Sequence, residues 1–360
     1  MADSTTLAES IARARAARDR ASVWLLGCIG SDGTPDGHET GNSWSRLPWA
    51  FALSGETAAG AAVLEWIARN GLRSDGDLAA PAYGIGRVGA YPLGHLAIGA
   101  QLLERHDVAR RVIGRLAEIQ TAEGGFSIDP VGGEFARFCD LLSTAQAGTA
   151  AVLAGRADIY EPVHRWVVAL RADQPEFSHR LLSARSPAGL VTDPPAAHAW
   201  IVDTDFAKPR QSYFTAGIAA VFLAAYGQAT GDAAALELGH GFLRLNLTGS
   251  VEQFDDLASV QACKFGWGLA AMHLADPRND YVPWLQRMVG WFEARQSPKG
   301  AWAPSTFLSP TPSRSEQMVK TAEHLMELNW VLAALAASAA TLSGSAVQQF
   351  PSRPAGSISR

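Results

Sequence analysis

Two stretches of this sequence share one pattern: "RQSPKGAW" at residues 295–302 and "IQTAEGGF" at residues 119–126. In each, a glutamine is followed by three residues and a glycine, and then by one residue and an aromatic. Both stretches end a segment with the apolar periodicity of an amphipathic helix, where a glycine can release the chain. The same pattern in the same local context indicates a repeated architecture.

Five segments begin alike, with capping residues followed by an amphipathic helical pattern. They start near residues 57, 107, 158, 232 and 280, so the repeat is about fifty residues long, with one insertion of about twenty-five residues. Asp107, Asp158, Asp232 and Asp280 are expected to be the N-caps of four of these helices, because Asp accepts hydrogen bonds from the first free backbone N–H groups.

Between these segments lie others that are apolar or small on every face, such as "YFTAGIAAVFLAAYGQ" (213–228) and "SVQACKFGWGLAAMHLA" (259–275). This pattern is typical of helices buried on all sides. With further inner helices near 46–53 and 315–340, and an outer one over 5–26, six inner and six outer helices result. The sequence therefore predicts an all-α protein, an (α/α)6 toroid over 1–342, with an irregular or hairpin insertion near 176–200 and a disordered tail over 343–360.

Composition narrows the range of partners. The chain has 360 residues, a formal charge of −5 and three cysteines. The charge is spread without basic patches, so we expect no nucleic-acid partner. The scattered cysteines favour a reducing cytoplasm, and no apolar run reaches the ~20 residues that a membrane span needs. A small molecule is the expected partner, and the oligomeric state stays open.

The two opening stretches resemble the Gln–Trp repeats of terpenoid cyclases and the Gly–Gly–Phe turns of protein prenyltransferase β subunits. Both families belong to a superfamily of α/α toroids, and the resemblance covers the repeats over roughly residues 5–340. It implies a toroid in which polar residues near the starts of the inner helices gather at one mouth of the ring.

Asp203 and Asp205 stand just before a predicted inner helix. Two carboxyl groups that share a site can keep one proton near neutral pH, and a protonated carboxyl can act as a general acid. The stretch resembles the Asp-x-Asp-Asp-Thr motif of class II terpenoid cyclases, which implies that Asp205 is the proton donor. The chain departs from the motif at Phe206, where the family has another Asp. The alternative is a turn cap beside Lys208 and Arg210.

Asp255 and Asp256 precede Cys263 by about two helical turns, and His324 lies on the last predicted inner helix. Asp, Cys and His in this order resemble the zinc ligands of prenyltransferase β subunits, so the resemblance implies a candidate zinc site of Asp256, Cys263 and His324. In that family the Asp lies two residues before the Cys, where this chain has Gln261. The alternative is a metal-free Cys–His or Asp–His acid–base pair; no other cofactor is expected.

Other polar and aromatic residues are expected around the cavity. A stripe of Glu316, Lys320, Glu323 and Glu327 follows one face of the last inner helix, and polar residues on a buried helix should line a cavity. The candidate catalytic residues are Asp203, Asp205, Asp255, Asp256, Cys263, His324 and His38. The candidate substrate-binding residues are Trp44, Tyr91, His95, Tyr213, Phe214, Trp267, Lys320, Glu327 and Trp330.

Taken together, these features predict an enzyme of small-molecule metabolism, a cyclase, isomerase or lyase that uses acid–base chemistry on a largely apolar substrate. One alternative is a carbohydrate-active enzyme, a glycosidase or sugar epimerase, because six-hairpin toroids also hold paired carboxylates and aromatic platforms. A second alternative is a non-catalytic toroid that binds a protein or peptide on its rim.

Overall fold

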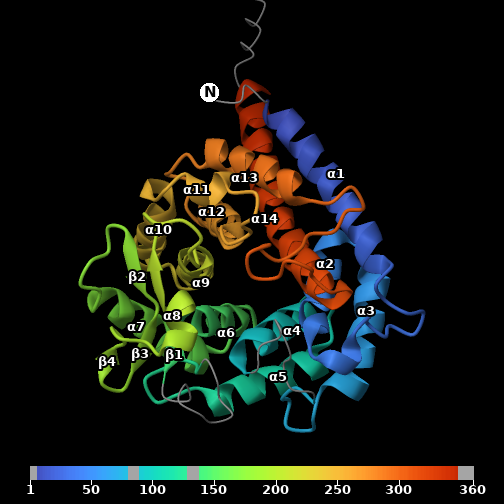
Figure 1. Cartoon of the computed structure of the whole chain (residues 1–360), viewed down its shortest axis with the longest axis horizontal. Helices are drawn as coiled ribbons and strands as arrows, with labels where there is room; N and C mark the ends of the chain where they lie inside the picture. Colours follow the sequence, from blue (N-terminus) through green and yellow to red (C-terminus); the bar gives the residue numbers. More distant parts are fainter. Residues whose placement is uncertain (1–5, 80–88, 128–137, 348–360) are drawn as a thin grey trace, which may run out of the picture.

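The computed structural model describes residues 6–79, 89–127 and 138–347, and it contains the two predicted sets of helices (Figure 1). The inner set is α2 (Leu47–Ser54), α4 (Ala90–Leu102), α6 (Leu141–Leu153), α9 (Phe214–Thr230), α12 (Cys263–Ala275) and α14 (Arg314–Val347). The outer set is α1 (Leu7–Leu26), α3 (Thr57–Trp66), α5 (His106–Ile119), α7 (Ala157–Ala172), α10 (Ala233–Thr248) and α13 (Val282–Arg295).

The inner helices form a closed ring. Each contacts the next along the chain, from α2 to α4, α6, α9, α12 and α14, and α14 returns to contact α2 and α1. In Figure 1 the elements follow one another around the ring in chain order, and α14 lies beside α1. The predicted (α/α)6 toroid is therefore confirmed. None of the helices in the described ranges combines the length and apolar character that a membrane span needs.

The two rings have the burial patterns that their sequences predict. The inner helix α9 is buried on nearly every face, whereas α5 buries one stripe that includes Val112 and Leu116. The N-cap prediction is right for Asp232, whose carboxylate accepts from two N–H groups of α10. It is wrong for Asp107 and Asp158, which lie in the first turns of α5 and α7. There, an arginine two residues earlier holds each carboxylate in a two-pronged ion pair, which replaces the cap.

The glutamines of the opening motif join neighbouring outer helices. Gln120 Nε2 donates to the carbonyl of Gly124 in its own turn, at 2.9 Å, and to the carbonyl of Ile159 on α7, at 3.1 Å. Gln296 makes the same pair of bonds, within its own turn and to Ala17 of α1, at 2.8 Å. The motif is thus a structural clamp between repeats, and the second copy closes the ring between its last and first outer helices.

The turn inside this motif occurs four times in the part of the chain that the structure describes. Gly33, Gly76, Gly124 and Gly300 all have φ between 84° and 94°, a left-handed conformation that favours glycine. A Cβ at any of the four would lie 2.3 or 2.4 Å from a backbone carbonyl oxygen of the neighbouring outer helix. The glutamine pattern revealed only two copies. The shared signal is a polar or charged residue and a glycine just after an outer helix, as in "SDG", "AEG" and "PKG".

Gly124→Ala is expected to lower the free energy of unfolding by about 3 kcal/mol or more, because left-handed strain and a clash with the Pro162 carbonyl oxygen add together. Gly155→Ala is the matched control, since Gly155 also has a positive φ, of 67°, but open space at its Cβ. It should cost only about 1 kcal/mol. Urea unfolding of both variants checks this, and equal losses would show that the close approach is not what the turn requires.

The predicted insertion holds most of the short strands. β2 (Arg180–Leu182) pairs with β5 (Asp203–Asp205), and β3 (Ala184–Ser186) pairs with β4 (Gly189–Leu190) and β1 (Cys139–Asp140). An irregular or hairpin insertion was expected here, and β3 and β4 form an antiparallel hairpin within residues 176–200, while β1 and β5 lie outside this range. The short helix α8 (Ala196–Val202) follows β4.

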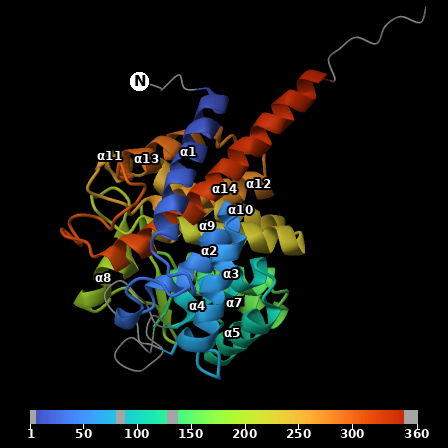
Figure 2. The same cartoon turned by 90° about the vertical axis from the view of Figure 1, so that its right-hand side faces the viewer.

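The remaining short elements lie in the connections between rings. They are η1 (His38–Thr40), η2 (Ser43–Arg46), η3 (Ile67–Gly71) and α11 (Glu252–Asp255). Helix α14 continues to Val347, five residues into the predicted tail, and its C-terminal part projects beyond the ring in Figure 2. The rest of the predicted tail, 348–360, lies outside the described residues.

Candidate active site

A cavity of about 180 Å³ opens at the mouth where the inner helices begin. Its walls come from the first turns of α4, α6, α9 and α12, the first three turns of α14, and the short turn η2. The inner helices are parallel, so their N-terminal residues meet at one end of the ring. The cavity is lined by Arg46, Tyr91, Leu142, Trp200, Phe214, Val260, Gln261, Cys263, Lys264, Pro304, Ser305, Leu308, Ser309, Glu316, Val319, Lys320 and Glu323.

A cluster of charged side chains forms the inner wall of this cavity. Lys264 Nζ on α12 forms an ion pair with Glu323 on α14 and lies 3.5 Å from Glu327 Oε1. Glu323 Oε2 also accepts from Lys320 Nζ at 2.5 Å, and its Oε1 lies 3.9 Å from Arg46 Nη2. Lys264 and Glu323 are 2% and 3% exposed and Glu327 is fully buried, so water screens these charges little. We call Arg46, Lys264, Lys320, Glu323 and Glu327 the charged cluster.

Glu323 and Lys264 are both ionised near neutral pH. Burial raises the pKa of Glu323, but Lys264, Lys320 and Arg46 together outweigh burial and hold it well below its ordinary value. Burial lowers the pKa of Lys264, but the negative charges beside it, including those of Glu323 and Glu327, keep it well above its ordinary value. By formal charge the cluster holds three cations and two carboxylates, and a further carboxylate, that of Glu316, lines the same cavity.

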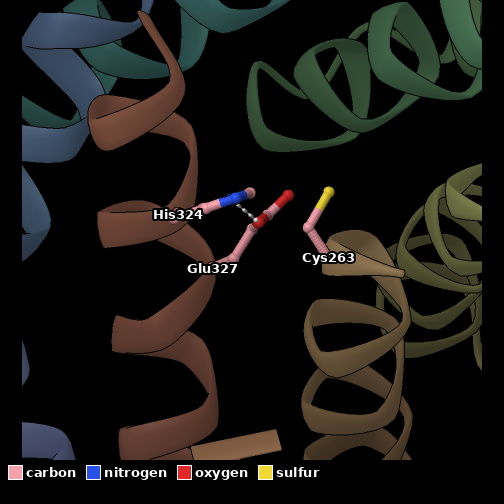
Figure 3. A group of neighbouring side chains, drawn as sticks. All are labelled: Cys263, His324 and Glu327. Atoms are coloured by element: carbon pink, nitrogen blue, oxygen red, sulfur yellow. Dashed lines mark hydrogen bonds and ion pairs between the residues drawn. The ribbon is translucent and has the colours of Figure 1, made fainter. Parts of the chain in front are cut away.

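Figure 3 shows His324 and Glu327 on one helix facing Cys263 on another; Cys263 lines the cavity, whereas His324 does not. His324 Nδ1 lies 3.0 Å from Glu327 Oε2, and Figure 3 shows the Glu327 carboxylate between the His324 ring and the Cys263 sulfur. Because a carboxylate only accepts, Nδ1 of His324 carries the proton. The ring is enclosed by three aromatic side chains, and burial lowers its pKa. His324 is therefore a neutral imidazole that belongs to the wall rather than to the cavity surface.

The zinc site implied by the family resemblance does not fit these residues. Cys263, His324 and Glu327 offer three ligand atoms within 4.8 Å of one another, but Asp256 is not among them. Lys264 Nζ lies 4.0 Å from the Cys263 sulfur and 3.5 Å from Glu327 Oε1, so an ammonium that would repel a metal cation already lies beside two of the three ligand atoms. Burial also raises the pKa of Cys263, which keeps the thiol protonated, whereas zinc binds the thiolate.

Purified protein is therefore expected to carry less than about 0.1 equivalent of zinc, and a chelator should leave its melting temperature unchanged. Plasma emission spectrometry of the dialysed protein measures the metal. Cys263→Ala serves as the comparison, because it removes the one sulfur ligand. About one equivalent of zinc in the wild type, lost in this variant, would contradict the charge argument.

The predicted acid pair lies outside the cavity lining. Asp203 makes a two-pronged ion pair with Arg180, at 2.8 and 2.7 Å, across the β2–β5 pair. Asp205 accepts from the backbone N–H of Ala207 and pairs with Lys208 at 3.1 Å. Although burial raises the pKa of Asp205, these two contacts lower it further than burial raises it. Asp205 is thus ionised at neutral pH, the opposite of what a proton donor needs, and the turn-capping alternative describes it correctly.

Asp255 and Asp256 are also engaged away from the cavity. Asp255 pairs with Arg287 at 3.0 Å and is largely exposed. Asp256 pairs with Arg210 at 3.1 Å and accepts from the N–H of Ala258. Burial raises the pKa of Asp256, but these partners lower it overall. Both aspartates end the short helix α11 and hold the loop that leads to α12.

His38, His95 and Trp44 contact backbone carbonyls and aromatic side chains and do not line the cavity. His38 Nδ1 lies 3.0 Å from the Pro35 carbonyl, and its ring packs edge-on against Trp66, which also contacts the buried Trp44. His95 is fully buried, and its Nδ1 lies 2.8 Å from the carbonyl of the residue four positions earlier. Burial and the charge of Arg46 lower the pKa of His95.

The predicted binding residues do not lie together. Tyr91, Phe214 and Lys320 line the cavity, and Glu327 belongs to the charged cluster behind it. Tyr213 is fully buried, and its hydroxyl donates to a backbone carbonyl in the loop before α9. Two predicted binding residues line a second cavity at the other end of the ring: Trp267 and Trp330.

Arg46, Trp200 and Lys264 are among the cavity residues that were not predicted from the sequence. A signal existed for Lys264, because it is the only charged residue in the otherwise apolar stretch "SVQACKFGWGLAAMHLA". A charge on a helix that is buried on all sides needs a partner or a ligand. Arg46 and Trp200 carry no comparable signal, since both lie in short elements between helices.

No protein-family model matches the chain, and no curated protein does. Solved structures match its fold. The type II terpene cyclase MstE from Scytonema, in complex with its product merosterolic acid A, is 16% identical, with a TM-score of 0.58 over 91% of this chain and 100% of that one. A family 76 glycoside hydrolase, a mannosidase from Bacteroides thetaiotaomicron, is 14% identical, with a TM-score of 0.61 over 90% of this chain and 100% of that one.

A second family 76 glycoside hydrolase, from a bovine strain of Bacteroides thetaiotaomicron, is 13% identical, with a TM-score of 0.63 over 90% of this chain and 78% of that one. At such identities the matches establish architecture and not activity. The chain is thus an α/α toroid, with the fold found in terpene cyclases and in family 76 glycoside hydrolases.

Proposed function

We propose that this protein is an enzyme that isomerises a small, largely apolar substrate carrying an anionic group, or eliminates a group from it. The observation that carries the proposal is the charged cluster on the wall of the 180 Å³ cavity. Burying ions is costly, and well-packed apolar residues often stabilise a protein more than a buried ion pair does. Five charged side chains at the mouth of an apolar ring therefore favour a role in binding or catalysis.

The three cations of the charged cluster favour some reactions over others. A unit charge about 5 Å from another contributes about 3 kcal/mol at the effective dielectric constant of a partly buried site. Lys264, Lys320 and Arg46 would therefore oppose a carbocation in the cavity, as in a cation-initiated cyclisation. The same three side chains would stabilise a carboxylate, an enolate or a departing anion. Among the predicted reactions, this favours isomerisation and elimination over cyclisation.

Each residue then has a definable role. The three cations hold the anionic group of the substrate and the negative charge that develops on its oxygen. Glu323 accepts the proton when a carbon–hydrogen bond breaks, because a bound anion beside it raises the pKa of its carboxyl group. The Tyr91 hydroxyl, 3.4 Å from Glu323 Oε1, lies where it can pass a proton back to the substrate. Trp200, with half of its surface exposed, and Phe214 contact the apolar part.

A matched pair of ligands tests this proposal without knowledge of the natural substrate. Benzoate and benzamide have nearly the same shape, but only benzoate is charged. Benzoate is expected to raise the melting temperature and to bind at least ~10-fold more tightly than benzamide, because only a charge-assisted contact satisfies the cluster. The preference should disappear in Lys320→Met and persist in Asp205→Asn. Equal binding of the two ligands would refute the proposed anion site.

A carbohydrate-active enzyme is the alternative from a different class, and the exposed Trp200 at the cavity is the feature that favours it. Glycosidases use two carboxyl groups about 5–10 Å apart, one of them protonated. Within the described residues, the carboxylates near the cavity are compensated by lysine or arginine, or accept a backbone N–H group. Release of reducing sugar from mannan or other polysaccharides would favour this alternative. A rim-binding, non-catalytic toroid has less support, because the ring is not filled at this mouth.

A further inference from the structure

A second cavity lies at the opposite end of the ring. It measures about 550 Å³, and all six inner helices contribute to its lining. On each helix the residues that line it lie C-terminal to those near the charged cluster. On α4, for example, Tyr91 faces the first cavity and Ile98 the second. Trp49 and Trp267, whose rings pack edge-on at 5.4 Å, line this second cavity, and Trp49 also packs against the buried His95. We call this second cavity the apolar pocket.

Small residues create the hollow. Where α9 and α12 face the apolar pocket, four of their seven lining residues are alanines: Ala224, Ala225, Ala229 and Ala271. A ring that only needed a packed core would gain stability from larger apolar side chains here, since unfilled volume forfeits dispersion contacts. The volume lies in the ~300–1,000 Å³ range of small-molecule sites.

The lining is uncharged but contains unused hydrogen-bond donors. No Asp, Glu, Lys or Arg is among the described residues that surround the apolar pocket. Trp267 and Trp330 both line the pocket; their indole nitrogens are buried, and neither has an acceptor within the described structure. A buried donor without an acceptor costs about 1–3 kcal/mol. An occupant that offers one neutral oxygen would remove this cost.

We propose that the apolar pocket binds a neutral, largely apolar small molecule that carries a carbonyl or ether oxygen. This site is separate from the proposed active site at the charged cluster. Its ligand is neutral, whereas the proposed ligand of the charged cluster is an anion. The uncharged lining excludes an anion, and the buried indole N–H groups select a molecule with an acceptor over a pure hydrocarbon. Exposed Leu102 and Leu153, at 42% and 45%, offer an apolar approach to it.

The probe for the experiment is 6-propionyl-2-(dimethylamino)naphthalene, a neutral fluorescent ketone of suitable size. We expect saturable binding with a blue-shifted emission and energy transfer from the tryptophans that line the pocket. Trp330→Phe keeps the apolar ring but removes the N–H, so the dissociation constant should rise about 2- to 10-fold. Ala225→Phe fills the pocket and should abolish binding, whereas Ala234→Phe, on the exposed face of α10, should not change it.

Competition separates this inference from the proposed function. Benzoate at saturating concentration should leave binding of the naphthyl ketone unchanged, because the two ligands occupy opposite ends of the ring. Displacement by benzoate, undiminished binding in Ala225→Phe, or no saturable binding up to the solubility limit would each overturn the inference. A last contrary result concerns the oligomeric state. If the protein is a stable dimer that Leu153→Asp converts to a monomer, and only the monomer binds the probe, then a second copy of the chain covers the pocket and the inference is wrong. Apart from displacement by benzoate, none of these results would bear on the anion preference of the charged cluster.

Discussion

Lys264→Met is expected to lower the free energy of unfolding by about 3–5 kcal/mol and to abolish the preference for benzoate over benzamide. The reason is that Glu327 is fully buried and Lys264 is the only lysine or arginine within ion-pair distance of it among the described residues. Removing one partner of a buried pair leaves an uncompensated charge in the interior. Urea unfolding monitored by tryptophan fluorescence and circular dichroism measures the loss.

Two further variants show whether charge or volume is responsible. Lys299→Met changes a surface lysine in the same way and should alter stability by less than about 0.5 kcal/mol. Lys264→Met combined with Glu327→Gln removes both charges, so a large part of the lost stability should return. If the double variant is as unstable as Lys264→Met alone, the ammonium matters through its packing, and the electrostatic account of the cluster is wrong.

Glu323→Gln is expected to have opposite effects on binding and on turnover. Within the charged cluster it leaves Glu327 as the one carboxylate beside three cations. The protein should therefore become less stable, and benzoate should bind about 10-fold more tightly. Turnover of the natural substrate, once identified, should fall by ~10²-fold or more, because the proposed proton acceptor is gone.

Isothermal titration calorimetry measures the change in benzoate affinity. Glu118→Gln, which removes an exposed carboxylate from α5, is the matched control and should change neither quantity. Weaker benzoate binding in Glu323→Gln would mean that Glu323 only orders the lysines. Unchanged turnover would remove it from the reaction.

The sequence was sufficient for the architecture because the toroid repeats one simple contrast. The segment around α9 is apolar on every face and α5 on one face only, and this contrast, repeated six times, fixes inner and outer rings. The sequence also located two of the turns that follow outer helices, because Gly124 and Gly300 each lie four residues after a glutamine.

The site was harder to predict because its charges meet only after the ring closes. Asp205 looked like a buried acid, but Lys208 and the N–H of Ala207 keep it ionised, and a motif alone does not reveal such partners. Lys264 and Glu323 lie 59 positions apart and come into contact only because α12 packs against α14. Arg46 enters from a short turn with no periodicity.

The most direct test of the central claim, that the charged cluster is an anion-binding active site, is a crystal structure with 4-iodobenzoate, whose iodine can be located by anomalous scattering. We expect one strong iodine peak in the cavity between α4, α9 and α14, with the carboxylate against Lys320, Lys264 or Arg46 and the ring beside Phe214. Iodine found only at the opposite end of the ring or on surface arginines, with the cavity filled by ordered water, would contradict it.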